Sequence, residues 1–168
     1  MTKQALQMPV SVLFVCLGNI CRSPTADGVF QQKVKAAGLA DQIIIDSAGT
    51  GGWHIGNPAD PRASKYAAKR GYDMSALRAR QVVSSDFERF DYILAMDNNN
   101  LQDLQAMCPD AYQDRVQLML DYLPEDFPTP TSEVPDPYYG GDDGFEWVLD
   151  LIEAASDRLL ADIQQRLA

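Results

Sequence analysis

Two cysteines and an arginine lie within one short stretch of the chain, VCLGNICRSP (15–24). Five residues separate Cys16 from Arg22, and Cys21 stands directly before the arginine. Cysteine sulfur can form a disulfide, bind a metal ion or, as a thiolate, attack an electrophile. A guanidinium is always charged and can bind two oxygens of one phosphate. The stretch therefore raises three alternatives, a disulfide, a metal site and a reactive thiolate, and each requires something different of the rest of the chain.

The residues on either side predict a strand that ends at Cys16 and a helix that begins directly after the turn. The preceding residues, VSVLFVC (10–16), are almost continuously apolar. Ser23-Pro24 is typical of a helix start, because serine caps free N–H groups and proline suits the first helical position. The turn thus lies at the carboxyl end of a strand, where ligands bind in open α/β sheets. Gly18 and Asn19 tolerate the left-handed dihedral angles that such a turn needs.

The backbone N–H groups of this turn predict an oxyanion site next to Cys16. They point inward in such a turn, and the positive end of the following helix adds to their effect. The same groups and the Arg22 guanidinium favour a thiolate at Cys16, which is suited to nucleophilic attack on the phosphorus of a bound phosphate. Cys16 and Arg22 are therefore the candidate catalytic pair. The residues expected to bind the phosphate or support the loop are Leu17, Gly18, Asn19, Ile20, Cys21 and Ser23.

The sequence also holds a candidate for the acid and base that hydrolysis of a phosphate ester needs. Asp136 lies in VPDPYYGG (134–141), with Pro135 and Pro137 stiffening the backbone on both sides. Its many acidic neighbours favour the protonated form that a general acid requires. The chain has a single histidine, His54. A lone histidine in a loop is more typical of a solvated surface group, so Asp136 is the preferred candidate.

The composition of the 168-residue chain limits the classes of function. A formal net charge of −10 argues against nucleic acid or an anionic membrane as the main partner. Three cysteines do not form a disulfide framework and favour a reducing compartment. No stretch reaches membrane-spanning length, and the apolar run at residues 12–16 is too short for a signal peptide. We therefore expect a cytoplasmic protein. The cysteines and His54 lack the spacing of zinc ligands, so no metal or cofactor is expected.

Short apolar runs alternate with helical patterns, which is typical of βαβ units. The runs, whose continuous hydrophobicity suits strands covered on both faces, occupy residues 10–16, 43–47, 91–97 and 116–120. Helices are expected at residues 23 to about 37, 61–70, 98–107 and from Val148 to the C-terminus. The predicted fold is α/β, a single three-layer domain (1–168) with a central, about four-stranded parallel sheet and helices on both faces. Residues 1–8 are expected to form a short N-terminal extension, and residues 121–144 a long loop that bears the acid.

Several segments together resemble the low molecular weight protein tyrosine phosphatases. The two most specific are VCLGNICRSPTAD (15–27) and DPYYGG (136–141). Further segments similar to the family, in the family's order, are DSAGTGGWHIGNPADPRA (46–63), ARQV (79–82) and FDYILAMDNNNL (90–101). The resemblance runs from about residue 9 to the C-terminus.

This resemblance implies a protein tyrosine phosphatase that needs no cofactor and forms a phosphocysteine intermediate. Cys16 would be the nucleophile and Arg22 would hold the phosphoryl oxygens. Asp136 would protonate the phenol and then deprotonate water. Asn19 would lock the loop, and Ser23 would assist departure of the thiolate. The partner would be a phosphotyrosine-containing protein, such as a tyrosine kinase or its targets, and the expected state is a monomer.

The resemblance also implies a substrate pocket and a redox pair. Trp53, Tyr138 and Tyr139 would form the walls of a slot for an aryl ring, for which flat aromatic side chains are suited. Cys21 would form a reversible disulfide with Cys16 and protect it from over-oxidation. The acidic residues around Asp136 suggest a preference for substrates with basic residues near the phosphotyrosine.

One residue departs from the family pattern. Members commonly carry a histidine two residues before Ala-Arg-Gln, hydrogen-bonded to the loop asparagine and serine, and LRARQ places Leu77 there. Leucine forms no side-chain hydrogen bond, so the support of Asn19 and Ser23 must differ. We expect reduced activity or an altered pH dependence rather than loss of function.

Three alternative functions share parts of this pattern. An arsenate reductase would need two further cysteines close together, whereas this chain has only Cys108 beyond the loop. A protein-arginine phosphatase carries a small polar residue where this loop has Ile20. A non-catalytic phosphotyrosine-binding module would not need Cys16, Arg22 and Asp136 together.

Overall fold

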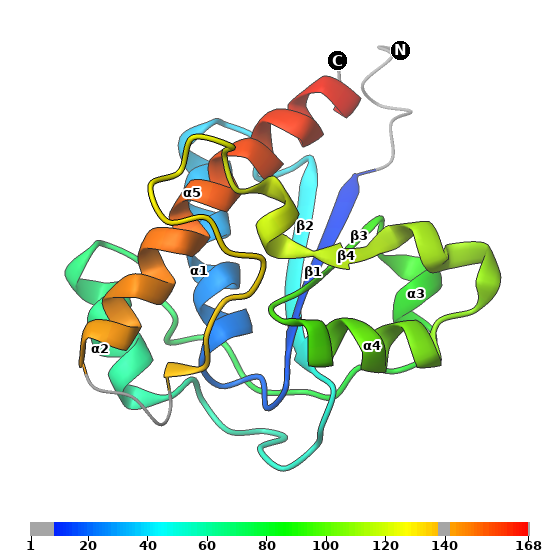
Figure 1. The fold of residues 1–168 in the computed structure, drawn as a ribbon, viewed down its shortest axis with the longest axis horizontal. Helices are drawn as coiled ribbons and strands as arrows, with labels where there is room; N and C mark the ends of the chain where they lie inside the picture. Colours follow the sequence, from blue (N-terminus) through cyan, green and yellow to red (C-terminus); the bar gives the residue numbers. More distant parts are fainter. Residues whose placement is uncertain (1–8, 138–141, 168) are drawn as a thin grey trace.

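The apolar run that ends at Cys16 forms the centre of a parallel sheet (Figure 1). This computed structural model describes residues 9–137 and 142–167. The four strands of the sheet are β1 (Val10–Cys16), β2 (Ile43–Gly49), β3 (Tyr92–Ala95) and β4 (Val116–Leu118). They lie in the order β2-β1-β3-β4, and all three pairings are parallel, as the sequence predicts.

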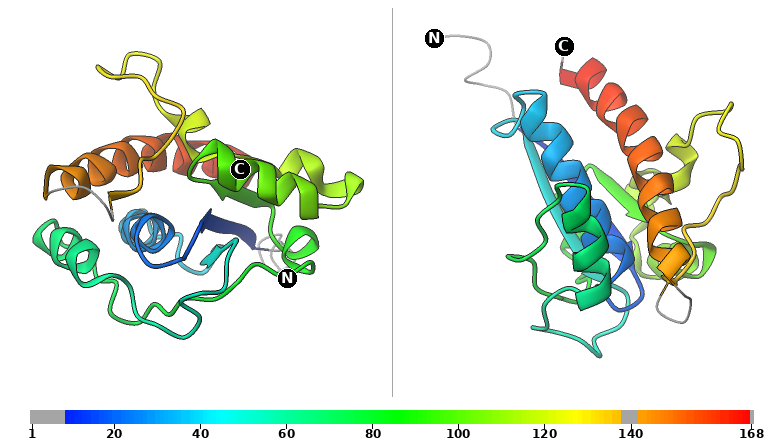
Figure 2. Two further views of the ribbon diagram at one scale, coloured as in Figure 1. Left: turned by 60° about the horizontal axis from the view of Figure 1, so that its bottom comes forward. Right: turned by 90° about the vertical axis from the view of Figure 1, so that its left-hand side faces the viewer.

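Helices cover both faces of the sheet. The α-helices are α1 (Arg22–Ala36), α2 (Pro61–Lys69), α3 (Asp86–Arg89), α4 (Asn98–Met107) and α5 (Asp142–Leu167). Two 3-10 helices, η2 (Asp110–Arg115) and η3 (Met119–Tyr122), flank β4. Figure 1 shows α1, α2 and α5 on one side of the sheet and α3 and α4 on the other. Figure 2 shows α1 and α5 side by side, in agreement with their packing against each other.

Alternate residues of β1 build two separate hydrophobic clusters. Val12 and Phe14 belong to the cluster that α1 and α5 cover, where Phe14 meets the ring of Phe30 edge to face. Leu13 and Val15 belong to the cluster on the other face, under α3 and α4. Because successive side chains of a strand point to opposite faces, a strand buried on both faces must be apolar throughout. This explains the unbroken apolar run that predicted β1.

The strand order places the end of β1 at a special position. The chain passes through α1 to β2 on one side of β1, and β3 then lies on its other side. The loops that follow β1 and β3 therefore diverge at the carboxyl edge of the sheet. Such a switch point is where ligands bind in open α/β sheets.

Several element boundaries differ from the predictions, each for a local reason. Helix α1 begins at Arg22, with Cys21 at the cap position, so the prediction that Ser23 caps this helix is wrong. The hydroxyl of Ser23 is instead used by Cys16. Strand β3 ends earlier than predicted because Asp97 turns the chain to cap α4. The end of the predicted run 116–120 turns into η3.

Other boundaries extend beyond the predicted ranges. Strand β2 continues to Gly49, and α5 begins at Asp142, before the predicted start at Val148. The helices α3, η2 and η3 are too short to show a helical period in the sequence. The predicted extension at residues 1–8 lies outside the described residues. No helix in the described part of the chain is long and apolar enough to cross a membrane.

Candidate active site

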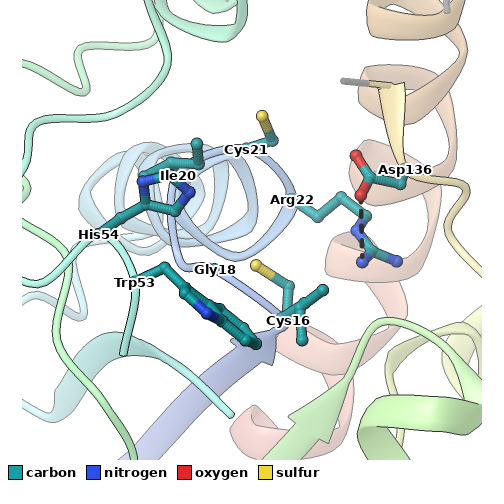
Figure 3. Close-up of a pocket in the computed structure, with 9 residues that line it drawn as sticks. Cys16, Gly18, Ile20, Cys21, Arg22, Trp53, His54 and Asp136 are labelled. Atoms are coloured by element: carbon teal, nitrogen blue, oxygen red, sulfur yellow. Dashed lines mark ion pairs between the residues drawn. The ribbon is translucent and has the colours of Figure 1, made fainter. Parts of the chain in front are cut away.

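The carboxyl end of β1 opens into a pocket with a volume of about 330 Å³ (Figure 3). The residues that line it are Cys16, Leu17, Gly18, Ile20, Cys21, Arg22, Trp53, His54 and Asp136. They come from the loop after β1, from the segment after β2 and from the loop before α5. All of them except His54 are among the candidate site residues from the sequence. The fold thus brings together side chains that lie more than a hundred residues apart.

The loop after β1 bends back toward the sulfur of Cys16. Asn19 is the turning point, with a φ of 58°, and asparagine tolerates this left-handed conformation better than most residues. Its backbone N–H donates to Cys16 Sγ over 3.3 Å. An N–H group aimed at the sulfur favours the thiolate over the neutral thiol. This contact is the one expected from the sequence of the turn.

Ser23 forms a second contact with the sulfur. Its Oγ lies 3.0 Å from Cys16 Sγ, and it accepts a hydrogen bond of 2.8 Å from Asn19 Nδ2. The Ser23 hydroxyl can donate to the sulfur or, over 3.4 Å, to the carbonyl of Ala48. A thiolate can only accept, so ionisation of Cys16 makes Ser23 the donor. Two donors can therefore stabilise one sulfur anion.

The end of β2 closes against the loop at Gly49. A Cβ at this position would lie 2.7 Å from the carbonyl oxygen of Leu17, so only glycine fits. The N–H groups of Thr50 and Gly51 donate to the carbonyls of Cys16 and Leu17, each over 2.9 Å. The carbonyl groups of Cys16 and Leu17 are thus satisfied by the segment that follows β2.

Arg22 is held by three groups from two segments, the residue before α4 and the loop that bears Asp136. The side chain is only 4% exposed, and its Nη1 donates to Asp97 Oδ2 over 2.6 Å and to the carbonyl of Val134 over 3.0 Å. Its Nη2 lies 3.9 Å from Asp136 Oδ2, the ion pair drawn in Figure 3. Burial alone would lower the pKa of Arg22, but the negative charges of Cys16 and Asp97 outweigh it and raise the pKa. The guanidinium is thus fixed and charged beside the pocket.

Asp97 is a site residue that the sequence interpretation did not single out. Its Oδ2 binds Arg22, while its Oδ1 accepts the N–H of Asn100 and caps α4. The available signal was its position, directly after an apolar strand and before a helical segment. Carboxyl ends of neighbouring parallel strands meet at one edge of the sheet, so an aspartate there can reach the loop after β1.

Val134 fixes the end of the long loop that bears Asp136. It is fully buried, and its N–H donates to the carbonyl of Met96 over 2.7 Å. Its own carbonyl accepts from Arg22. Glu133 adds an anchor through its Oε2, which accepts the N–H of Asn98 over 2.8 Å. Asp136 therefore lies two residues beyond a firmly bound position, on a backbone that proline restricts on both sides.

The two cysteines of the loop differ in their surroundings. Burial, reinforced by the negative charge of Asp60, raises the pKa of the Cys21 thiol. Cys21 thus stays protonated at neutral pH, whereas Cys16 has two hydrogen-bond contacts suited to an anion. Both are free thiols that line the same pocket.

Trp53 and His54 lie on the side of Cys16 opposite Asp136 in Figure 3. Trp53 is 72% exposed, so its ring is available to a ligand. His54 is half-buried rather than a solvated surface group, and its Cδ2 would lie 2.9 Å from a Cβ added at Gly18. The predicted wall residues Tyr138 and Tyr139 lie outside the described residues.

Leu77 packs against the hydrophobic cluster under α1 and α5. The side chain of Asn19 is held instead by the backbone N–H of Arg80, which donates to its Oδ1 over 2.9 Å. Asn19 and Ser23 are therefore supported by a backbone amide and by each other, rather than by a side chain at position 77. An amide from the 79–82 segment and the two residues themselves make the hydrogen bonds.

The sequence and the fold are both similar to known proteins. The family model for low molecular weight phosphotyrosine protein phosphatase matches residues 11–168. Low molecular weight protein-tyrosine-phosphatase YfkJ of Bacillus subtilis is 43% identical over 156 residues, 93% of this chain and 97% of that protein. Low molecular weight phosphotyrosine protein phosphatase of Homo sapiens is 42% identical over 146 residues, 86% of this chain and 89% of that protein. The structure of a protein tyrosine phosphatase from Entamoeba histolytica with Hepes in the active site is 43% identical and has a TM-score of 0.89, covering 95% of this chain and 99% of that chain.

Proposed function

Because this chain belongs to the low molecular weight phosphotyrosine protein phosphatase family, we propose that it hydrolyses phosphotyrosine in proteins through a phosphocysteine on Cys16. The observation that carries the proposal is the sulfur of Cys16, which meets Asn19 N–H and Ser23 Oγ in a pocket shared with Arg22 and Asp136. A nucleophile, a fixed cation and a carboxyl group thus face one cavity. This set supports both steps of the proposed reaction.

In the first step the Cys16 thiolate attacks phosphorus and the bond from phosphorus to the tyrosine oxygen breaks. The loop N–H groups and Arg22 bind the phosphoryl oxygens, whose charge grows as the transition state forms. Asp136 gives its proton to the departing phenolate oxygen, which leaves as neutral tyrosine. The product on the enzyme is a phosphocysteine, with Asp136 now a carboxylate.

In the second step a water molecule attacks the phosphorus of the phosphocysteine. Asp136 takes a proton from the water, and the sulfur–phosphorus bond breaks to release inorganic phosphate. Ser23 donates a hydrogen bond to the sulfur as it becomes an anion again. The step returns Asp136 to the acid and Cys16 to the thiolate, so the cycle closes without any other reagent.

The lining of the pocket favours an aryl phosphate. Ile20 and Trp53 contribute apolar surface around the site. A flat phenyl ring is compatible with these walls, whereas the charged guanidinium of phosphoarginine would lose hydration there. Tyr138 and Tyr139 are proposed to complete the slot.

The two cysteines of the loop are proposed to respond to oxidation. The free thiols Cys16 and Cys21 line one pocket, which supports a reversible disulfide between them under oxidation. The odd number of cysteines supports a reducing, cytoplasmic compartment. A monomer acting on phosphotyrosine proteins, among them tyrosine kinases or their targets, is consistent with a pocket built within one chain.

The test is phosphate release from a phosphotyrosine peptide in EDTA by the wild type, Cys16→Ser and Cys108→Ser. We expect turnover by the wild type, none by Cys16→Ser and near-normal turnover by Cys108→Ser, whose thiol lies outside the pocket. Asp136→Asn should slow turnover about 10²- to 10⁴-fold, because it can neither give nor take the proton. A wild type that releases phosphate from phosphoarginine but not from phosphotyrosine would overturn the proposal, as would an active Cys16→Ser variant.

A further inference from the structure

Asn19 connects the Cys16 loop to a segment 61 residues further along the chain. Among the described residues it is the only non-glycine residue with a positive φ. A residue in that conformation keeps it only where its surroundings hold it. The holding contacts are the N–H of Arg80 on Asn19 Oδ1, at 2.9 Å, and the bond of 2.8 Å from Asn19 Nδ2 to Ser23. The hydrogen bond from Ser23 to the sulfur therefore depends on where the Arg80 amide lies.

The side chain of Arg80 is gripped by two carboxylates from different elements. Its Nη1 and Nη2 bind the two oxygens of Asp86 at 3.0 and 3.2 Å, a two-point contact with the start of α3. Its Nε donates to Asp46 Oδ2 on β2 over 3.0 Å. Asp86 is buried, and two-point guanidinium–carboxylate pairs of this kind are stronger and more directional than single contacts. We call these three residues the arginine clamp.

The clamp holds a short segment that the sheet alone holds weakly. The backbone of residues 80–82 is joined to β2 at Gly49, whose N–H donates to the Arg80 carbonyl and whose carbonyl accepts from the N–H of Val82. Asp86 Oδ2 also accepts the N–H of Val83, the residue after this segment, over 2.9 Å, so one carboxylate binds both Arg80 and Val83. Without the guanidinium, the side chain at position 80 would no longer bind Asp46 on β2 and Asp86 in α3.

Leu77 leaves Asn19 without a hydrogen bond from the side chain at position 77. It stands three residues before Arg80 and packs into the hydrophobic cluster, where an aliphatic side chain can make no hydrogen bond to Asn19 or Ser23. The Arg80 N–H is then the contact from this segment to the Asn19 side chain. Through Asn19 and Ser23, this amide is connected by hydrogen bonds to the sulfur of Cys16.

We infer that Arg80 is a positioning residue for the reaction: clamped by Asp46 and Asp86, it fixes the amide that orients Asn19 and thereby keeps Ser23 as a donor to Cys16. The inference rests on the proposed role of Cys16. Arg80 would thereby stabilise the sulfur anion of Cys16, both in the free enzyme and when the sulfur–phosphorus bond of the phosphocysteine breaks. It predicts a change in kcat and in the pH dependence of thiol reactivity more than a change in KM.

The experiment measures the rate at which iodoacetate alkylates Cys16 as a function of pH, with fragment masses that separate Cys16 from Cys21. The variants are Arg80→Met and the double variant Arg80→Met/Asp86→Asn. The double variant leaves no unpaired charge at Asp86, so it guards against a protein that merely unfolds. Arg115→Met is the matched control, because Arg115 also contacts α3, through the carbonyls of Phe87 and Glu88, and has no bond to Asn19.

We expect the double variant to remain folded, with a urea midpoint near that of the wild type. On the rising limb of the pH profile its Cys16 should react about 10-fold more slowly than wild-type Cys16, so that the limb moves to higher pH. Its kcat for a phosphotyrosine peptide should fall about 10-fold, with KM changed less than threefold. Arg80→Lys should recover part of the loss through a single ionic contact, and Arg115→Met should match the wild type in alkylation.

Two outcomes would overturn the inference. One is an alkylation profile and kcat of the double variant equal to those of the wild type. The other is an equal change in Arg115→Met, since that would indicate a general loss of rigidity near α3. Failure of the proposed function gives a different result. Cys16 of the wild type would itself be unreactive toward iodoacetate at pH 6, and added inorganic phosphate would not slow its alkylation.

Discussion

Asp97 uses its two carboxylate oxygens for two different purposes. One caps α4 through the N–H of Asn100, and the other binds the buried guanidinium of Arg22. The cap contributes to the stability of the helix, whereas the ion pair sets the direction of Arg22 toward the pocket. A substitution that preserves one purpose and removes the other can separate them.

Asp97→Asn keeps an oxygen acceptor for the cap but removes the charge that holds Arg22. We expect KM for a phosphotyrosine peptide and the inhibition constant of inorganic phosphate each to rise roughly 10-fold, since Arg22 loses its fixed direction. Asp97→Asn should also lower stability, because the buried guanidinium loses its charged partner, and Asp97→Ala should cost roughly 1 kcal/mol more because the cap is also lost. Steady-state kinetics and urea unfolding measure the two effects. Unchanged phosphate inhibition in Asp97→Asn would show that Arg22 does not depend on this contact.

At the scale of single residues the sequence predicted the groups whose chemistry is unusual in itself. Cys16 and Arg22 stand out by type and spacing, and Asp136 by its prolines. Asp97 and Arg80 are ordinary aspartate and arginine residues whose partners lie 75 and 61 residues away. Their roles arise from parallel strands and loops that meet at one edge, and spacing along the chain does not encode such contacts.

At the scale of elements the predictions succeeded where hydrophobicity is continuous or periodic. β1 and α4 match their predicted ranges, because each is bounded by a clear change of residue type. The short helices α3 and η3 were missed, since four residues cannot display a period. Asp86 opens α3, so the missed helix is also the one that carries the arginine clamp.

An arginine at the end of α2 binds several carboxylates of α5. Arg70, at the end of α2, binds Glu153 over 2.6 Å and Glu146 over 2.8 Å, and it lies 3.0 Å from Asp150. The hydroxyl of Tyr72 also donates to Glu153. Three carboxylates on one face of α5 repel each other unless this guanidinium is present.

Arg70→Met should therefore lower the free energy of unfolding by roughly 1 to 2 kcal/mol, more than an isolated surface ion pair contributes. The loss should shrink in high salt, which screens the carboxylates. Lys33→Met is the control, because Lys33 forms a single pair with the exposed Asp157 on the same helix α5, at 2.8 Å. Urea unfolding at low and high salt measures both variants. Equal losses of unfolding free energy in the two variants would mean that Arg70 contributes no more to stability than a single surface ion pair.

At the scale of the whole molecule, a buried carboxyl group in α1 links stability to pH. Asp27 is 1% exposed, and its Oδ1 accepts from Gln31 Nε2 over 2.6 Å. Burial raises its pKa from 3.8 to about 6, against the opposing hydrogen bonds from Gln31 and Ser47. The folded protein thus holds a proton at Asp27 over a pH range in which the unfolded chain has released it.

The sign of the effect follows from this difference in bound protons. Between pH 4 and pH 6 the folded state binds more protons at Asp27 than the unfolded state does, so the free energy of unfolding falls as pH rises. At about 1.4 kcal/mol per pH unit, this one group costs roughly 3 kcal/mol by pH 7. Asp27→Asn, which keeps an acceptor for Gln31, should remove this slope and make the variant more stable than the wild type at pH 7. The two proteins should differ least near pH 4, where Asp27 is protonated in the folded wild type. Urea unfolding at intervals from pH 4 to pH 7.5 measures the difference, and curves that stay parallel across that range would show that Asp27 is already ionised in the folded protein.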